Sequence, residues 1–171
     1  ITNELGVEPI MINSSLVSAQ SRRRLYWTNI PNVKQPQDKG IFLKDILESG
    51  IPFNDKSYCL TANYNGAIVW NTLERKQRTM IAEIKNTDKK FYTVKNKKTL
   101  IEKTNQRFAY YDINLPDGDY HIRKLTPVEC ERLQTLPDNY TGIMSKTQRY
   151  KQLGNGWTVD VIAHILRAIW N

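Results

Sequence analysis

Three consecutive arginines that lead into an apolar segment are the first residues whose types and spacing suit chemistry. The run Gln20-Ser21-Arg22-Arg23-Arg24 is followed by Leu25-Tyr26-Trp27, and aromatic residues of this kind are typical of strands. Alternate side chains of a strand point to the same face, so Arg22 and Arg24 would project together. Two guanidinium groups on one face can bind a carbonyl, a carboxylate or a phosphate. A basic strand at the edge of a sheet would have the same composition, so the run alone leaves both interpretations open.

A second pattern begins at Arg123 and combines a helix start with two arginines. It reads Arg-Lys-Leu-Thr-Pro-Val-Glu-Cys-Glu-Arg-Leu-Gln-Thr-Leu-Pro-Asp. Thr126 and Glu129 have the spacing of a capping box, with proline at the first helical position, which predicts a helix over 127–136. A structural helix explains most of these residues, and Arg123 and Arg132 are the candidates for a function.

Residues 152–157, Gln-Leu-Gly-Asn-Gly-Trp, form the third pattern. Gly154 and Gly156 permit positive φ angles and a close approach of two backbones. A helix is predicted to follow from Val159, and free amides at its N-terminus would favour an anionic group such as a carboxylate. The end of one helix followed by the start of another explains the same glycines, and this plainer interpretation is favoured when the pattern is taken by itself.

In this order, the three patterns resemble the C-terminal motifs of the DNA (cytosine-5) methyltransferases. The family's Gln-x-Arg-x-Arg before a strand is matched at Gln20, Arg22 and Arg24, and its Gln-x-Gly-Asn before an apolar helix at Gln152, Gly154 and Asn155. Between them lies Arg-x-Leu-Thr-x-x-Glu-x-x-Arg-Leu-Gln-x-x-Pro-Asp, matched at Arg123, Leu125, Thr126, Glu129, Arg132, Leu133, Gln134, Pro137 and Asp138. Three motifs in one order are far more specific than any of them alone.

Two weaker features extend the likeness. The segment Leu60-Thr61-Ala62-Asn63-Tyr64 is similar to the threonine-containing stretch of the family's target-recognition region. Trp157 resembles the branch that contains the de novo methyltransferases of vertebrates and some phage and bacterial enzymes. The strong matches cover about residues 12–31 and 120–166.

The resemblance implies an enzyme that flips a cytosine out of the duplex, adds a cysteine thiolate to C6 and transfers the methyl group of S-adenosylmethionine to C5. By this resemblance, Arg24 would hold the carbonyl of the flipped cytosine and Arg22 would support the reacting loop. The wall of the cofactor pocket would include Asn155, Gly156 and Trp157. Contacts with DNA are expected from Gln20, Thr61, Asn63, Tyr64, Lys97, Lys98 and Arg123, the last of which would alternatively brace the recognition region.

The motifs that supply the chemistry in this family are missing from the sequence. The family's Phe-x-Gly-x-Gly, Pro-Cys and Glu-Asn-Val motifs belong upstream of Gln20, and neither Cys59 nor Cys130 follows a proline. We therefore expect a C-terminal portion that acts on duplex DNA with an N-terminal catalytic half and transfers no methyl group alone. A non-catalytic DNA-binding module derived from such an enzyme is the main alternative. An RNA-binding domain is another, but it leaves the Gln-x-Gly-Asn motif unexplained.

The elements expected to position these motifs make an α/β chain. It would contain the last strands of a Rossmann-like methyltransferase sheet (1–31), an inserted, mostly-β target-recognition region (32–119) and a C-terminal helical segment that returns to the catalytic domain (120–171). Apolar spacing and turn residues predict strands over 9–13 and 24–30, a helix over 41–48, and strand-like structure over 57–70 with a turn at 63–66. Short strands and loops are expected over 71–119, and helices over 127–136, 146–153 and 159–170.

The charge distribution favours a nucleic-acid partner. Lys and Arg number 25 against 17 Asp and Glu, a formal net charge of +8. The segment Arg75–Arg107 holds 11 basic and 3 acidic residues, so it carries the whole excess and the rest of the chain is neutral. A concentrated basic segment is the electrostatic signature of nucleic-acid binding, although a lysine-rich solvated surface is the simpler alternative.

Length and residue types exclude other classes of protein. A chain of 171 residues makes one domain or two small ones, and its apolar runs are far shorter than the ~20 residues of a membrane span. Cys59 and Cys130 have neither the number nor the spacing of a disulfide framework or a zinc site, and Cys130 is expected to be a small buried hydrophobic residue. These cysteines indicate a reducing compartment, and the resemblance implies the cytoplasm of a bacterial or phage-infected cell.

Overall fold

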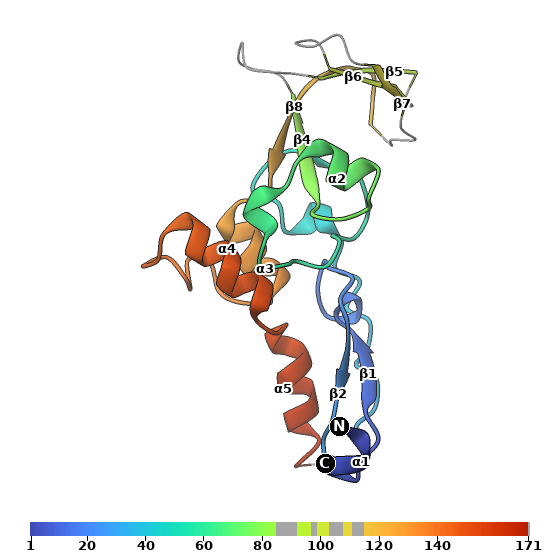
Figure 1. Ribbon diagram of the computed structural model, residues 1–171, viewed down its shortest axis with the longest axis vertical. Helices are drawn as coiled ribbons and strands as arrows, with labels where there is room; N and C mark the ends of the chain where they lie inside the picture. Colours follow the sequence, from blue (N-terminus) through green and yellow to red (C-terminus); the bar gives the residue numbers. More distant parts are fainter. Residues whose placement is uncertain (85–91, 97–98, 103–107, 111–114, 171) are drawn as a thin grey trace.

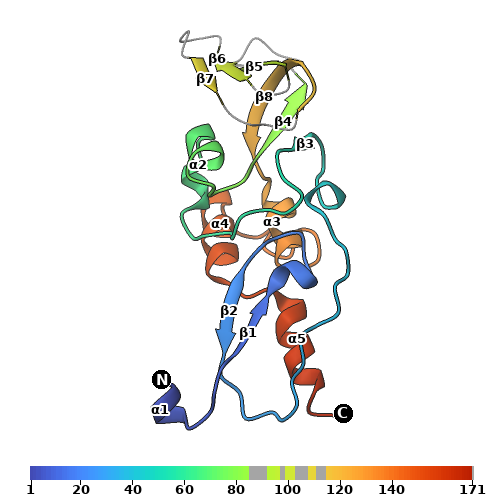
Figure 2. The same cartoon turned by 90° about the vertical axis from the view of Figure 1, so that its right-hand side faces the viewer.

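A two-stranded sheet and one helix form the end of an elongated molecule at which both termini lie (Figure 1). The computed structural model describes residues 1–84, 92–96, 99–102, 108–110 and 115–170. A short helix, α1 (Thr2–Leu5), precedes strand β1 (Ile10–Asn13), which pairs antiparallel with β2 (Arg23–Tyr26). Helix α5 (Val159–Arg167) lies along this sheet (Figure 2), and together they bury a small cluster of Ile12, Val17, Val161 and Ile165.

Strand β1 was expected over 9–13 and is found there, but β2 is shorter than the expected 24–30. Ile10 pairs with Tyr26 at the last position of the ladder. Pro9, just before Ile10, has no amide proton with which to continue the pairing. The chain therefore leaves the sheet after Tyr26, well before Pro31.

The segment 41–70 contains less regular structure than its apolar pattern predicts. The helix expected over 41–48 is a single 3-10 turn, η2 (Leu43–Asp45). The prediction of strand-like structure over 57–70 is wrong, except for its turn. The segment forms one isolated bridge from Ser57 to Gln20, followed by the 3-10 turn η3 (Tyr64–Gly66) and helix α2 (Val69–Leu73). Ser57 bonds to the loop before β2 at Ala19 O and Ser21 N, so this stretch packs as a loop on another loop.

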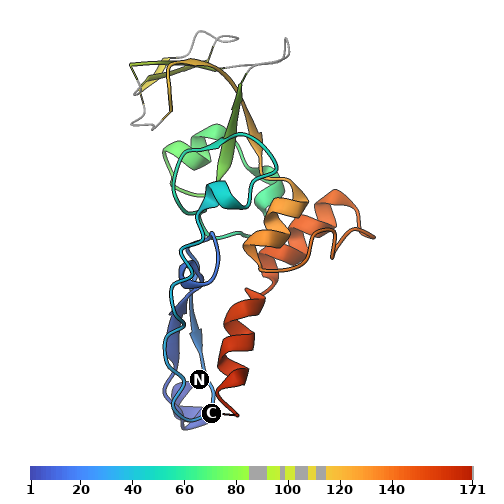
Figure 3. The same ribbon diagram turned by 180° about the vertical axis from the view of Figure 1, so that it is seen from behind.

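Short strands were expected between 71 and 119, and the strands found there join β3, from 51–52, in an antiparallel sheet with the order β3-β4-β8-β5-β6-β7. Its two long neighbours, β4 and β8, rise from the middle of the molecule to its upper end (Figure 3). The six strands are β3 (Ile51–Pro52), β4 (Met80–Ile84), β5 (Tyr92–Lys95), β6 (Thr99–Glu102), β7 (Phe108–Tyr110) and β8 (Gly118–Lys124). Much of the basic segment, including Lys97 and Lys98, lies outside the described residues.

Two further helices, α3 (Pro127–Leu133) and α4 (Lys146–Asn155), occupy the middle of the molecule. The capping box is confirmed: Glu129 N donates to Thr126 Oγ1 over 3.1 Å, and Thr126 N donates to a Glu129 oxygen over 2.8 Å. α3 ends earlier than predicted, since Thr135 has a left-handed φ of 55°. α4 begins after Ser145, as expected, but continues through Gly154.

The larger hydrophobic cluster joins α3 and α4 to the base of the six-stranded sheet. Its most buried members include Leu43, Tyr64, Ile81, Leu133 and Tyr150. The chain is therefore an α/β protein with two antiparallel sheets. No helix among the described residues is long and apolar enough to span a membrane.

Candidate functional site

Gln20 occupies the centre of a buried polar network between the two hydrophobic clusters. Its side chain is 0% exposed. Its Nε2 lies 2.7 Å from Leu133 O, 3.0 Å from Gln134 Oε1 and 3.3 Å from Thr158 Oγ1, while its Oε1 accepts from Leu60 N over 3.3 Å. The network thus joins the first motif to the second and to the start of α5. Gln20 has no exposed surface with which to contact DNA in this structure, which corrects our expectation for this residue.

Arg22 is also buried, and it joins the segment at Leu60 to the third motif. Its guanidinium donates to Leu60 O over 2.8 Å and to Gly156 O over 2.9 Å, and it lies within 3.5 Å of Gly154 O. Only 5% of Arg22 is exposed. A side chain whose donors are satisfied inside the protein positions its neighbours and is not free to bind a ligand.

Arg24, by contrast, is exposed and lightly held. Its Nη1 donates to Arg23 O over 2.7 Å, and its Nη2 lies 3.5 Å from Cys59 Sγ. Of the two interpretations left open for this run, a pair of free guanidinium groups on one face is not found: Arg22 is buried, whereas Arg24 is exposed.

Gly154 is required by a close approach of two backbones. A Cβ on Gly154 would lie 2.1 Å from Thr61 C and 2.3 Å from Ala62 N. The predicted close approach is thus confirmed, whereas the predicted positive φ is not: Gly154 is helical, and Gly156 has a φ of −70°. The missing side chain lets the 61–62 segment lie directly on α4.

The N-terminus of α5 does not offer the anion site that the glycines suggested. Val159 N donates to Gln134 O over 3.0 Å, Asp160 N to Thr135 Oγ1 over 2.9 Å, and Val161 N to Thr158 O over 3.1 Å. The amides that would bind an anion are already paired with protein oxygens, so this expectation is wrong.

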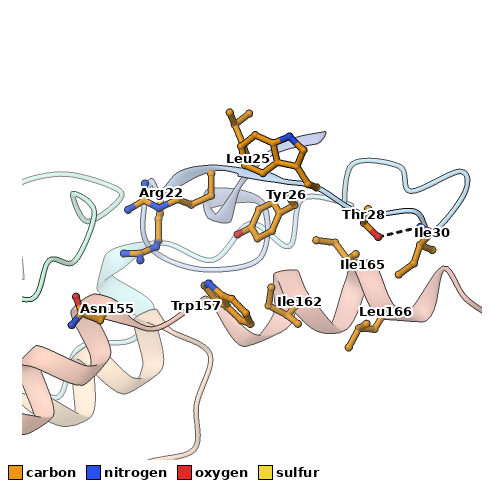
Figure 4. A pocket seen from close by; sticks show the side chains of 12 residues that line it. Arg22, Leu25, Tyr26, Thr28, Ile30, Asn155, Trp157, Ile162, Ile165 and Leu166 are labelled. Carbon is orange, nitrogen blue, oxygen red and sulfur yellow. Dashed lines mark hydrogen bonds between the residues drawn. The ribbon is translucent and has the colours of Figure 1, made fainter. Parts of the chain in front are cut away.

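A pocket of about 500 Å³ opens between β2 and α5, next to Arg24 (Figure 4). Pockets that bind small molecules typically have such volumes. Asn155 and Trp157 form one wall, and Tyr26 faces them from β2. The lining is completed by Arg22, Leu25, Trp27, Thr28, Ile30, Ile162, Ile165 and Leu166.

The three residues expected at a cofactor wall differ in their availability. The indole of Trp157 is 66% exposed, and no hydrogen bond joins the Asn155 side chain to any described residue. Gly156 is not among the lining residues of this pocket. Its carbonyl accepts from Arg22, and its amide donates to Gln152 O over 2.7 Å. Asn155 and Trp157 can therefore meet a ligand directly, whereas Gly156 holds the turn between them.

Arg123 has the bracing role that was one of its two expected roles. It donates to Glu83 Oε1 over 2.8 Å, to both oxygens of Glu129 over 2.8 Å, and to Ser49 O over 2.7 Å. Glu129, at the start of α3, is fully buried. Arg123 thereby ties α3 to β4 of the six-stranded sheet, and only 15% of its side chain is exposed.

Some side chains of residues 60–64 lie in the core and others on the surface. Tyr64 is 1% exposed, and its hydroxyl donates to Thr79 O and accepts from Leu125 N over 2.7 Å. Burial raises the pKa of Tyr64 well above its usual range. It therefore makes no surface for DNA, contrary to expectation, whereas Thr61 and Asn63 are exposed and line a second pocket with Lys76, Gln77 and Arg78.

Sequence reasoning missed Lys76, Gln77 and Arg78 as site residues. Their only sequence signal was membership of the basic segment. The two cysteines differ in their surroundings: Cys59 is partly buried beside Arg22 and Arg24, whereas Cys130 lies in the core. Cys130 is 0% exposed, as predicted, and burial raises its pKa well above the usual range. No group of three or more His, Cys, Asp or Glu side chains within the described ranges could hold a metal ion.

Comparisons with known proteins agree with the motifs. A family described as C-5 cytosine-specific DNA methylase matches residues 8–171. The Type II methyltransferase M.NlaX of Neisseria lactamica is 29% identical over 156 residues, which cover 85% of this chain and 46% of that protein. The orphan methyltransferase M.SPRI of Bacillus phage SPR is 42% identical over 55 residues, 29% of this chain and 12% of that one.

A solved structure has the same fold. The Entamoeba histolytica methyltransferase EhMeth superposes with a TM-score of 0.58 at 18% identity, over 96% of this chain and 53% of that one. The chain thus spans about half the length of M.NlaX and of EhMeth.

Proposed function

Because the chain belongs to the C-5 cytosine-specific DNA methylase family, we propose that it is the DNA-recognising, C-terminal portion of an enzyme that methylates C5 of cytosine in duplex DNA. The observation that carries this proposal is the meeting of the three motifs at one place. Buried Gln20 and Arg22 join them through hydrogen bonds, and exposed Arg24 stands beside a pocket of ligand size.

The residues around that pocket fit one end of S-adenosylmethionine, which supplies the methyl group when bound. Asn155 offers an amide with no hydrogen-bond partner in the described part of the chain, and Trp157 is exposed on the same wall. A polar group and an apolar or aromatic group can therefore be held together. Arg24 would bind the carbonyl of the flipped cytosine. Arg22 and Gly156 are positioning residues that fix the turn carrying Asn155 and Trp157.

The rest of the enzyme would cover the end of the molecule at which the termini lie. Here the sheet has two strands. Large apolar side chains are exposed on this sheet (Met11, Leu25), on α5 (Leu166) and just after α5 (Trp170). Several large apolar side chains exposed at one end of a molecule indicate an interaction site. Relatives about twice as long support an N-terminal catalytic half as the occupant, and that half would supply the thiolate nucleophile.

The segments proposed for this enzyme follow the packing. Residues 1–31 and α5 share one hydrophobic cluster, which supports a catalytic portion completed by the C-terminal segment. The target-recognition region, expected over residues 32–119, would extend to Lys124. β8 (Gly118–Lys124) belongs to the six-stranded sheet, which supports this longer range. Bacterial and phage relatives support the cytoplasm of a bacterial or phage-infected cell as the place of action.

Methyl transfer from labelled S-adenosylmethionine to duplex DNA tests the proposal. We expect no transfer by this chain alone and transfer when an N-terminal half with an intact Pro-Cys motif is added. Transfer by this chain alone would overturn the division of roles. DNA binding without transfer by the reassembled protein would instead support the alternative, a non-catalytic recognition module.

A further inference from the structure

A second pocket, of about 440 Å³, is lined in part by Cys59, which is a neighbour of Arg24. Cys59 Sγ accepts from Arg22 Nη1 at 3.3 Å and lies 3.5 Å from Arg24 Nη2, and Cys59 also lines this pocket, which we call the basic hollow. Its lining consists of Ser21, Tyr58, Cys59, Thr61, Asn63, Lys76, Gln77 and Arg78. The hollow is therefore continuous with the surface that presents Arg24.

The chemistry of the lining suits a phosphate. Lys76 and Arg78 are cationic, and none of the described residues that line the hollow is acidic. The side chains of Thr61, Asn63, Lys76 and Gln77 are exposed and have no hydrogen-bond partner among the described residues. An anionic oxygen is the group that a cation and several unpaired donors bind best.

The loop that carries these donors is held in place by buried residues. Gln77 N donates to Asn71 O over 2.9 Å, and Thr72 Oγ1 donates to Arg78 O over 2.9 Å. Thr79, which is 1% exposed, accepts from Tyr58 N over 2.8 Å. The loop is thus anchored before and after its basic residues.

Lys76 and Arg78 both have a φ of 51°, a left-handed conformation that residues other than glycine seldom adopt. Such conformations persist where the surrounding structure imposes them, and they cluster at binding sites. Arg78 Nη1 donates to Gly66 O over 3.1 Å, so its guanidinium braces the hollow. Lys76 also lines the hollow, and its ammonium has no hydrogen bond or ion pair with any residue that the structure describes.

We propose that the basic hollow binds a phosphodiester group of the DNA strand beside the target cytosine. Lys76 supplies the charge, and Thr61, Asn63 and Gln77 supply hydrogen bonds to the phosphate oxygens. Arg78 positions the loop. This inference rests on the proposed function, because it assumes that duplex DNA lies over Arg24, and it names the backbone contact that would set the register of the duplex at the pocket.

Fluorescence anisotropy with two end-labelled duplexes of unrelated sequence tests the hollow in the 171-residue chain. The variant Lys76→Asn removes the charge, and asparagine tolerates the left-handed conformation. Lys76→Arg keeps the charge, and Thr61→Val removes one donor with little change of shape. Lys151→Gln, an exposed lysine on α4 outside the hollow, is the matched control, and a thermal melt verifies that each variant folds.

We expect Lys76→Asn to weaken binding about eightfold at about 0.1 M salt and to lower the log–log salt slope by about 0.9, equally on both duplexes. Lys76→Arg and Lys151→Gln should stay within about twofold of the parent, and Thr61→Val should weaken binding by roughly two- to fivefold. Equal losses from Lys76→Asn and Lys151→Gln would overturn the hollow and leave the proposed function standing.

Two other outcomes would also count against the inference. A loss on one duplex alone would mean that Lys76 reads a base and not a phosphate. Failure of the parent chain to bind either duplex at low salt would contradict DNA recognition itself, and therefore both the proposed function and the hollow.

Discussion

Gln20 Nε2 lies 3.0 Å from Gln134 Oε1, although 114 residues separate them in the sequence. Both side chains are almost fully buried, as is Thr158, which contacts both. A buried polar network stabilises a fold only when all its members are satisfied, and no buried side-chain nitrogen or oxygen in the described part of the chain lacks a partner. The three motifs therefore act as one structural unit.

Replacing Gln20 should destabilise the fold. Gln20→Leu removes the hydrogen bonds to Leu133 O and Gln134 Oε1, which keep Ser18 and Thr158 as donors, and leaves Leu60 N without its acceptor. A buried group left unpaired costs about 1–3 kcal/mol, and each lost hydrogen bond costs about 1 kcal/mol. We expect the free energy of unfolding to fall by roughly 2–4 kcal/mol, measured by urea denaturation. Gln152→Leu, at an exposed position on α4, is the control and should change stability by less than about 0.5 kcal/mol. Equal effects would contradict the importance of the network.

The two arginines on either side of Arg23 should respond differently to lysine. Arg22→Lys loses the planar fork that reaches Leu60 O and Gly156 O together, so the unfolding free energy should fall by about 2–3 kcal/mol. Arg24→Lys, at an exposed side chain, should leave the melting temperature nearly unchanged. Thermal melts of the two variants side by side measure this, and similar losses would show that Arg22 is not the structural residue of the pair.

Arg24 should instead matter in the complete enzyme. If its guanidinium binds the cytosine carbonyl, its donors act on charge that develops as the thiolate adds to C6. Arg24→Ala should then lower the single-turnover rate about 10²–10³-fold with saturating enzyme, while Arg24→Lys should also be impaired because it lacks the fork. DNA affinity should change far less, because one contact of many is lost. If Arg24→Ala transfers methyl groups at the rate of the unmodified enzyme, Arg24 does not bind the cytosine carbonyl in the transition state.

Gly154→Ala should destabilise the chain, although alanine favours helices. In an ordinary helix interior the change stabilises by about 1 kcal/mol. Here the new Cβ would lie 2.1 Å from Thr61 C, so α4 and the 61–62 segment must separate, at a cost of about 1–3 kcal/mol. Gly66→Ala is the control, because its Cβ would meet Arg78 Nη1 at an ordinary 3.6 Å. Chemical denaturation of both variants decides, and a stabilised Gly154→Ala would refute the close approach.

Glu131 should make stability depend on acid pH. Burial alone raises its pKa, but hydrogen bonds from Thr141, Arg149 and Asn139 outweigh burial and lower the pKa below its ordinary value of 4.5. A lowered pKa in the folded state means that the unfolded chain binds the proton more readily. The stabilisation is therefore complete above about pH 4.5 and is lost as the pH falls through the lowered value.

Urea denaturation between about pH 3 and pH 7 tests this dependence. The difference in unfolding free energy between the parent and Glu131→Gln should be largest above pH 4.5 and shrink below it. Glu74→Gln, at an exposed position, should leave the parent's curve unchanged. A difference that stays constant over the whole range would contradict the lowered pKa of Glu131.

Local signals were sufficient for the C-terminal helices and for the family. The capping box of Thr126 and Glu129, the start of α4 after Ser145 and strand β1 all depend on residues within a few positions of one another, whose preferences survive in any packing. Spaced motifs in a fixed order likewise need no coordinates to be recognised. These features, and the α/β class, follow from the sequence by itself.

Other features depended on contacts between distant segments. The helix expected over 41–48 shrank to one turn, and the strand expected over 57–70 became a loop on the segment before β2, because packing overrides weak local preference in short apolar runs. Polar motif residues gave no sign of their burial: Gln20, Arg22 and Tyr64 carry groups that water or protein can satisfy equally well.

The tertiary structure alone decided which motif residues hold the fold and which remain open. Gln20 and Arg22 were predicted with Arg24 as one functional run, yet their partners, Gln134 and Gly156, lie more than a hundred residues away. The left-handed turn at Lys76 and Arg78 is also set by Asn71, Thr72 and Thr79 around it, and not by the preference of lysine or arginine. Whether a side chain is buried, closely approached or left charged and exposed depends on how distant segments pack, and only the tertiary structure specifies that packing.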